Sequence, residues 1–248
     1  MIIEVLKWDS EFFQKKIGKL VILNNNDFEP DPFVEKATRE KFELIYIFKI
    51  NSELKWDHVL KAKLELVDTH LTMSKKFNRE EFHDTKYQFR TNLTENELNE
   101  CYSIAKETSR VSRFYNERSI GSDKTEKLYK IWIVNALNKT LSDGLFLAKV
   151  SNSILGIHLI KTDSINKIGY FSLTGVKSEN KGSGIGSSLW RQSFAYWANE
   201  CDIEIIKSPF SFKNLESFNF HLKMGFNKIE ECKYIYHWRN ITIDDPFQ

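Results

Sequence analysis

Short apolar runs typical of strands alternate along the chain with segments whose apolar residues recur at helical spacing. In the first third, strands are predicted at Ile2–Leu6, Lys19–Leu23, Leu44–Ile50 and Leu64–Met73, and helices at Phe33–Lys41 and Trp56–Lys63. The run Leu44–Ile50 is apolar almost throughout, so we expect it to be buried on both faces. Strands that alternate with helices predict a small α/β domain with a parallel or mixed sheet.

The composition becomes charged between Ser74 and His83, where Lys75, Lys76 and Arg79 precede two glutamates. This stretch predicts a boundary between two domains. We expect a smaller N-terminal α/β domain over residues 1–78, a linker over 79–86, a larger domain over 87–240 and a tail over 241–248.

In the remainder of the chain, the pattern predicts helices and strands in a different order from that of the first third. A capping box at Thr94 and Glu97 starts one helix. The other predicted elements are a strand at Tyr87–Arg90, a helix bearing Leu128, Ile131 and Trp132 on one face, strands at Gly144–Val150, Ile154–Ile160 and Ile168–Val176, a helix at Ile185–Asn199, a strand at Ile203–Ile206, a helix at Asn214–Lys223 with Leu215, Phe218 and Leu222 on its apolar face, and a strand at Ile229–Trp238. The short polar turns between the three middle strands predict an antiparallel meander.

A glycine-rich stretch, Lys-Gly-Ser-Gly-Ile-Gly-Ser at 181–187, joins a predicted strand to a predicted helix. The first N–H groups of a helix have no partner within the helix, and the positive end of its dipole points the same way, so such a loop is suited to binding an anion. Glycines at 182, 184 and 186 let the backbone approach a phosphate closely. Lys181 adds a positive charge at the rim.

Three phosphate-binding patterns compete for this stretch. The P-loop pattern fails because no Lys-Ser or Lys-Thr pair follows the last glycine, and the dinucleotide-binding pattern fails because Ser187 stands where its third glycine belongs. The acyl-CoA pyrophosphate pattern, [QR]-x-x-G-x-[GA], fits with one departure, since Lys181 stands in place of Gln or Arg. We therefore expect this loop to bind a coenzyme A pyrophosphate.

Composition and charge narrow the class of protein. The net charge of +2 gives no general electrostatic case for nucleic acid or a membrane surface as a partner. Cys101, Cys201 and Cys232 are scattered, which is typical of reduced thiols and predicts a cytoplasmic protein. Cys101 falls on an apolar helical stripe, so we expect it in the core rather than in catalysis. The histidines have no metal-ligand spacing, and we expect no metal.

A second motif follows the glycine loop after one predicted strand: Asn214, then Gly225 and Phe226 at the end of the next helix. With the order of elements and the loop, it resembles the GNAT superfamily of acyl-CoA N-acyltransferases over Tyr87–Trp238. This resemblance implies an acyl-CoA-binding GNAT domain with a mixed sheet, which the smaller N-terminal α/β domain precedes.

Within the superfamily, the chain looks most like the dTDP-amino-sugar N-acyltransferases, such as dTDP-fucosamine acetyltransferase. The matching segments are Trp8–Phe13, Val67–Thr69 and Ser112–Phe114. The resemblance implies a cytoplasmic step in making a surface-polysaccharide (lipopolysaccharide) sugar, and a homodimer. The acceptor would be the amino group of a dTDP-linked 3- or 4-amino sugar. The donor would be acetyl-CoA or a larger acyl-CoA such as 3-hydroxybutanoyl-CoA.

The resemblance also implies roles for individual residues. Main-chain groups of Leu173, Thr174, Gly175 and Val176 would pair with the pantetheine arm, as an added strand would. The N–H groups of Lys181, Gly182, Ser183, Gly184, Ile185, Gly186 and Ser187 would hold the pyrophosphate. Asn214 would cap the last helix, and whether it also contacts the coenzyme stays open.

Direct acyl transfer requires a neutral amine, stabilisation of the oxyanion and a proton for the departing thiolate. N–H groups near Leu173 could supply the oxyanion contact. The position of the family's usual tyrosine acid is occupied by His221, for which three readings stay open: proton donor, acceptor of the amine's proton, or surface helix residue. Tyr234 and Tyr236 are weaker substitutes that suit packing better.

Three arginines in a short irregular segment, Arg110, Arg113 and Arg118, are candidates to bind the diphosphate of a sugar nucleotide. With Ser112, Phe114 and Tyr170 they form the predicted acceptor site, although the arginines could equally belong to a solvated loop. Two other functions stay open: a GNAT that acylates a protein or small-molecule amine, and a non-catalytic acyl-CoA-binding module.

Overall fold

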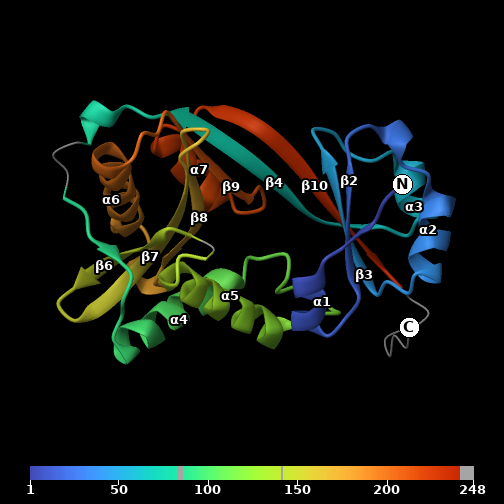
Figure 1. The fold of residues 1–248 in the computed structure, drawn as a ribbon, viewed down its shortest axis with the longest axis horizontal. Coiled ribbons are helices and arrows are strands. Elements are labelled where there is room, and N and C mark those ends of the chain that lie inside the picture. The colour runs from blue at the N-terminus through green and yellow to red at the C-terminus, as the bar shows by residue number, and fades with distance from the viewer. Residues whose placement is uncertain (83–85, 141, 241–248) are drawn as a thin grey trace. The chain divides into compact units, whose positions relative to one another are not determined.

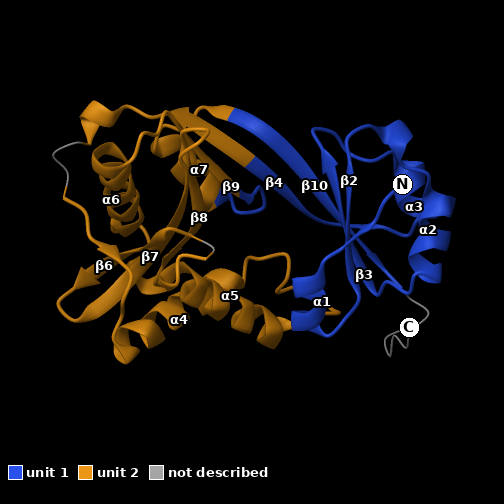
Figure 2. Ribbon diagram, in the orientation of Figure 1, with its two compact units in different colours: residues 1–71, 210–215, 229–248 blue, residues 72–209, 216–228 orange. Residues whose placement is uncertain are grey.

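The computed structural model describes residues 1–82, 86–140 and 142–240. The chain separates into two compact units (Figure 2). Unit 1 contains residues 1–71, 210–215 and the chain from Ile229 on, and unit 2 contains residues 72–209 and 216–228. This division differs from the contiguous ranges 1–78 and 87–240, because a strand near the C-terminus is added to the sheet of the N-terminal unit. The predicted tail at 241–248 and residues 83–85 of the predicted linker lie outside the described residues.

Unit 1 is a mixed α/β unit, as the sequence predicts. Its strand order is β1-β2-β3-β10-β4; β2 and β3 are parallel, whereas β1 with β2 and β3 with β10 are antiparallel. The elements are β1 (Glu4–Val5), α1 (Lys7–Phe13), β2 (Ile17–Ile22), the 3₁₀ turn η1 (Asn25–Asp27), α2 (Pro30–Arg39), β3 (Leu44–Ile50), α3 (Trp56–Lys61), β4 (Glu65–Lys76) and β10 (Lys228–Arg239).

The core of unit 1 joins the two ends of the chain. Phe33 of α2 is fully buried and packs edge-on against Trp238 of β10, with ring centroids 5.9 Å apart. Tyr236, also on β10, is part of the same apolar cluster as Ile45 and Ile47 of β3. Helix α2 begins at Pro30, earlier than predicted, because proline is well accommodated in the first helical turn.

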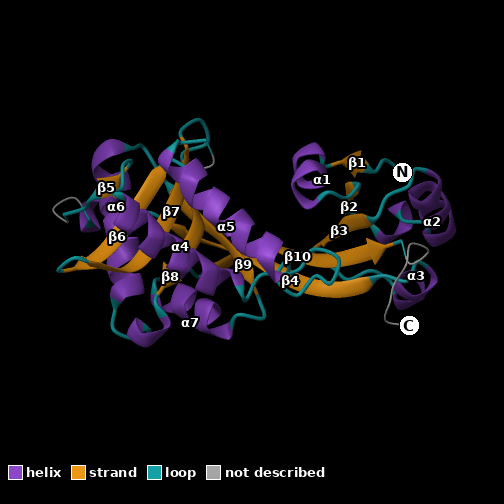
Figure 3. Ribbon diagram, turned by 90° about the horizontal axis from the view of Figure 1, so that it is seen from below, coloured by secondary structure: helices purple, strands orange, loops and turns teal. Residues whose placement is uncertain are grey.

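Unit 2 has the strand order β4-β9-β8-β7-β6-β5, to which β4 contributes from Thr72 on. Strands β6 to β8 form the predicted antiparallel meander, β5 pairs with β6 in antiparallel orientation, and β9 is parallel to β8. Helix α6 covers one face of this sheet, and α4 and α5 cover the other (Figures 1 and 3). The elements are η2 (Arg79–Glu81), β5 (Phe89–Arg90), α4 (Glu95–Ser109), α5 (Ser122–Leu137), β6 (Gly144–Val150), β7 (Ser153–Asp163), β8 (Ile168–Val176), η3 (Ser178–Asn180), α6 (Ile185–Glu200), β9 (Ile205–Ser211) and α7 (Leu215–Lys223).

Several local predictions for unit 2 are confirmed. Thr94 and Glu97 form the capping box of α4. The apolar residues predicted on the core stripe of α6 are all buried: Trp190, Phe194, Trp197 and Ala198. Cys101 is fully buried, and burial raises the pKa of its thiol to about 12, which fits a core residue rather than a nucleophile.

Two local predictions are wrong, and one strand is longer than predicted. Strand β4 runs on to Lys76, past its predicted end at Met73 and short of the predicted linker at 79–86. Helix α5 buries Ile133 in place of the predicted Ile131. Helix α7 presents Leu215 and Leu222 to solvent and buries His221, the reverse of its predicted apolar face.

Candidate functional site

The glycine stretch forms a tight loop between η3 and the start of α6. Gly182 and Gly184 have φ of +81° and +87°, the left-handed region that costs other residues energy. A Cβ atom at either position would meet nothing within 4 Å, so the space beside this backbone is open. Gly186 differs from the prediction, since its φ is not positive and a Cβ there would lie 3.3 Å from the Phe220 ring.

Main-chain donors are exposed at the start of α6. The first helical hydrogen bond runs from Ser188 N–H to Gly184 O at 3.0 Å. The N–H groups of Gly184, Ile185, Gly186 and Ser187 have no acceptor within the described parts of the chain. The N–H groups of Lys181 and Ser183 instead make long 3.4 Å contacts inside the turn. Four of the seven predicted residues therefore present donors at the positive end of the helix dipole.

Two carboxylates fix the surroundings of the loop. Glu107 of α4 accepts hydrogen bonds from the N–H and the hydroxyl of Ser178, at 3.1 and 2.9 Å, and so ties η3 to α4. Glu216, in the first turn of α7, forms an ion pair with Lys181 at 3.0 Å, and both side chains are largely exposed. Lys181 therefore lies at the rim, as predicted, with its charge directed to α7.

Strand β8 changes face at a bulge. Leu159 of β7 pairs with Leu173, but the next residue, Ile160, pairs with Phe171, so Ser172 is the extra residue. As a result, Phe171 packs on Trp190 of α6, whereas Leu173 joins the core beneath α4 and α5. The bulge lies at the start of the predicted pantetheine segment, Leu173–Val176.

Strands β8 and β9 separate just before that segment. Their described pairs end at Tyr170 with Lys207, although both strands continue beyond this point. The edge of β8 that faces β9 is thus left for another extended chain to bind. Thr174 turns its side chain inward: its Oγ1 accepts a hydrogen bond from Trp190 Nε1 at 3.0 Å and lies 2.9 Å from His158 Nδ1.

His221 is buried and held by two hydrogen bonds. Its Nδ1 lies 2.6 Å from Ser217 O, and a carbonyl can only accept, so Nδ1 carries the proton. Its Nε2 therefore accepts the hydrogen bond from Ser208 Oγ of β9, at 2.7 Å. The imidazole also packs edge-to-face with Trp190 and Phe226. Burial lowers the pKa of His221 to about 4, so the ring is neutral at neutral pH.

The predicted acceptor residues follow the end of α4. Arg110 is exposed, and the Arg113 guanidinium lies over the Phe114 ring at 4.3 Å. Phe114 N–H donates to Ser112 Oγ at 3.0 Å, so this short segment is ordered by its own contacts. Glu107 lies near the end of α4 and accepts a hydrogen bond from Ser178 N–H. The end of α4 that leads into this segment is therefore tied to η3, which immediately precedes the glycine loop.

The other candidates lie elsewhere. Tyr170 of β8 is half-buried. Asn214 immediately precedes α7 and is assigned to unit 1. Tyr236 is in the core of unit 1, where its hydroxyl accepts a hydrogen bond from Leu54 N–H at 3.2 Å. Within the described residues, no cluster of three or more potential ligands could hold a metal ion, and no helix is long and apolar enough to span a bilayer. His83 lies outside them.

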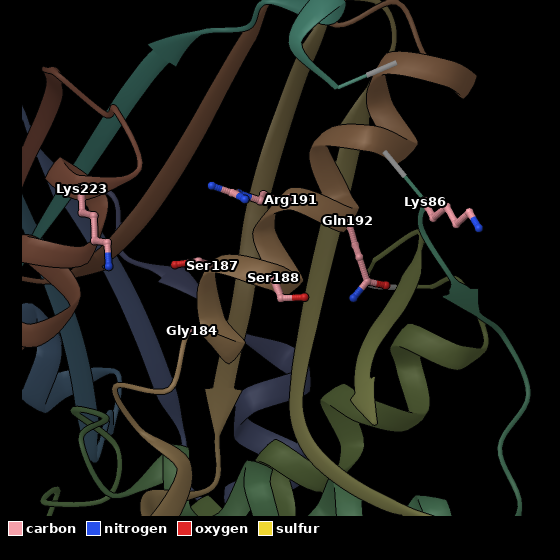
Figure 4. Close-up of a pocket in the computed structure, with 7 residues that line it drawn as sticks. All are labelled: Lys86, Gly184, Ser187, Ser188, Arg191, Gln192 and Lys223. Carbon is pink, nitrogen blue, oxygen red and sulfur yellow. The ribbon is translucent and has the colours of Figure 1, made fainter. Parts of the chain in front are cut away.

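Two shallow depressions lie beside α6, one of them next to the loop, and sequence reasoning missed both. One, of about 460 Å³, runs along α6 from Gly184 to Gln192 and is also lined by Lys86 and Lys223. The other, of about 450 Å³, shares Arg191 and Lys223 with it. Figure 4 shows Arg191, Ser187 and Lys223 directed toward one side of α6, whereas Lys86 extends away. The i, i+4 spacing of Ser187 and Arg191 was a signal available in the sequence.

Comparison with known proteins yields structural likeness alone. No protein-family model matches the chain, and no curated protein matches it. Among solved structures, it is similar to a functionally unknown conserved protein from Staphylococcus epidermidis, at 15% identity and a TM-score of 0.62, covering 92% of this chain and 85% of that one. It is also similar to a GCN5-related N-acetyltransferase from Sphaerobacter thermophilus, at 11% identity and a TM-score of 0.50, covering 83% of this chain and 64% of that one. The chain therefore has a mixed α/β fold similar to that of a GCN5-related N-acetyltransferase.

Proposed function

We propose that this protein is an acyl-CoA-dependent N-acyltransferase. The observation that carries the proposal is the row of four unpaired N–H groups, Gly184 to Ser187, at the start of α6. A diphosphate bound there would match both the donors and the helix dipole. The separation of β8 from β9 leaves an edge along which a pantetheine arm could pair. The likeness in fold to an N-acetyltransferase supports the same reading.

The proposed reaction is direct transfer. The neutral amine attacks the thioester carbonyl carbon, the C–S bond breaks, the nitrogen loses a proton and the sulfur gains one. Main-chain N–H groups beside the bulge at Ser172 would supply the oxyanion contact in this scheme. Tyr234 and Tyr236 are not needed in this scheme.

We give His221 an indirect part in the proton transfer. Its Nε2 is an acceptor and its Nδ1 proton is bound to a carbonyl, so the imidazole cannot itself be the donor at neutral pH. Ser208, the first residue of β9 beyond its last pair with β8, would pass its hydrogen to Nε2 as it takes one from the amine. The reverse shift delivers that proton to sulfur, which an imidazolium of low pKa favours.

The acceptor we propose is the amino group of a dTDP-linked 3- or 4-amino sugar, with acetyl or a larger acyl group as the donor. The support is the sequence resemblance at Trp8–Phe13, Val67–Thr69 and Ser112–Phe114, together with Arg110 and Arg113 as partners for a sugar diphosphate. A cytoplasmic homodimer belongs to the same proposal, and light scattering on the purified protein tests the dimer.

The test is a mass-spectrometric screen of acyl-CoAs against dTDP-3-amino and dTDP-4-amino sugars. We expect an amide product whose mass equals that of the amino sugar plus the acyl group, with one free coenzyme A per product. Acylation of other amines but of no sugar nucleotide would contradict the proposed acceptor. Binding of acyl-CoA without turnover of any amine would contradict the enzyme.

A further inference from the structure

Three side chains next to the glycine loop lie where a second anionic group could bind. Ser187 and Arg191 are one helical turn apart on the same side of α6, and Lys223 is the last residue of α7. Arg191 and Lys223 line both depressions, and the three side chains extend into the same space (Figure 4). The two cations share no ion pair with the described residues, so their charge is available to a ligand.

The space into which these three side chains extend lies beyond the N–H donors of the glycine loop. The rise from Gly184 to Arg191 is about 10 Å along the helix axis, and a helical side chain points back toward the N-terminus. The Arg191 guanidinium therefore lies above the turn that contains Ser187, at a short remove from the N–H groups at Gly184–Ser187. A ligand that fills both places carries two anionic groups separated by a small spacer.

We infer that Arg191 and Lys223, with the Ser187 hydroxyl, bind the 3′-phosphate of the coenzyme A ribose. A terminal phosphate carries nearly two negative charges and has several acceptor oxygens, which suits a guanidinium fork and an ammonium. In coenzyme A this phosphate is one ribose ring away from the diphosphate. The inference rests on the proposed function, because it requires the diphosphate to occupy the loop.

One acidic side chain limits the extent of the site. Glu81 lines the second depression together with Lys75, whose ammonium donates to Met224 O at 3.1 Å. Burial lowers the pKa of Lys75, with the nearby Glu81 carboxylate acting in the opposite direction. Lys75 is thus already engaged, and the phosphate is assigned to the side shared by Arg191 and Lys223.

The proposed site would distinguish between two forms of the coenzyme that carries the acyl group. Intact coenzyme A has the 3′-phosphate, whereas dephospho-coenzyme A has the same diphosphate and pantetheine without it. Calorimetric titration of the purified protein with both molecules separates the two subsites, and it needs no acceptor. We expect coenzyme A to bind about tenfold more tightly, and Arg191→Gln and Lys223→Gln each to weaken coenzyme A while leaving dephospho-coenzyme A nearly unchanged.

The matched control is Lys127→Gln, an exposed position on α5 that lines neither depression and removes the same charge. It should keep the wild-type preference for coenzyme A. Equal affinity of the wild type for both molecules, or equal weakening of both by Arg191→Gln, would overturn the 3′-phosphate assignment while leaving the loop intact. Failure of the wild type to bind either molecule would instead contradict the proposed function, and this inference with it.

Discussion

Individual side chains decide what chemistry this site can perform. His221 was predictable from its place four residues before Gly225, but its surroundings were not, because they come from other elements: Ser208 on β9 and Trp190 on α6. A sequence shows which residue stands at a motif position, and burial then determines its protonation. The His221 imidazole, which is neutral and held by two hydrogen bonds, is the clearest example in this molecule.

Ser208→Ala and His221→Phe should each lower kcat by about a hundredfold with little change in KM for the acyl-CoA, because both break the same relay. Combined, they should cost no more than either alone. Steady-state kinetics over about pH 6 to 9 measure these losses in kcat. Full turnover by His221→Phe across that range would remove His221 from the mechanism, and additive losses would separate it from Ser208.

His158 and His221, whose pKa values are lowered by burial, should make the protein sensitive to acid. Burial lowers the pKa of His158 to about 3 and that of His221 to about 4, both below the ordinary 6.5. The unfolded chain therefore takes up protons first as the pH falls. Stability is complete above about pH 6.5 and declines toward the folded pKa values, by up to about 1.4 kcal/mol per pH unit for each histidine.

Urea unfolding at a series of pH values tests this decline. His221→Gln should be less stable at neutral pH but should show a shallower dependence on pH between about 6 and 4.5, since one of the two histidines with a lowered pKa is gone. The same slope in the variant and the wild type would show that other groups cause the acid sensitivity.

Elements were predicted well where the pattern is local. The meander, the capping box of α4 and the buried stripe of α6 follow from alternation and helical spacing. The bulge at Ser172 was not predictable, because it depends on the register between two strands. The buried face of α7 was misassigned, since Phe220 and His221 contact Trp190 whereas Leu215 and Leu222 are exposed.

Gly184→Ala tests the loop as an element. It should lower stability by about 1 kcal/mol, because alanine at φ +87° is strained, and it should weaken binding of coenzyme A by disturbing the adjacent N–H groups. Gly121→Ala is the control: its Cβ would also meet nothing within 4 Å and it precedes α5, but its φ of +83° and ψ of 160° lie in a region that almost only glycine adopts. Thermal unfolding and calorimetry should therefore show at least as much destabilisation in Gly121→Ala as in Gly184→Ala, and weaker binding in Gly184→Ala alone. Weaker binding in both would mean that general destabilisation is responsible.

At the scale of the whole molecule, the two units are interleaved in sequence. Unit 1 takes β10 and residues 210–215 from beyond most of unit 2, an arrangement that a search for a linker could not reveal. Charge at 74–83 suggested a boundary, yet β4 continues through the first part of this stretch. Pairing between strands that are far apart in the sequence leaves no local signal, and it determines how the chain divides into units.

A fragment of residues 1–78 should therefore fail to fold. It lacks β10, so β3 loses its antiparallel partner and the core of unit 1 loses Tyr236 and Trp238. Circular dichroism and limited proteolysis of the fragment should report a largely unfolded, rapidly cleaved chain. A cooperative thermal transition in the fragment would show that the N-terminal segment is an independent domain.

The central claim is that main-chain amides at the start of α6 bind the diphosphate of an acyl-CoA. The most direct measurement is a crystal structure of the protein with coenzyme A. The account predicts diphosphate oxygens within hydrogen-bonding distance of the N–H groups of Gly184 to Ser187, and the pantetheine arm along β8 at Leu173–Val176. A diphosphate bound elsewhere, or those four N–H groups bonded within the protein, would contradict it.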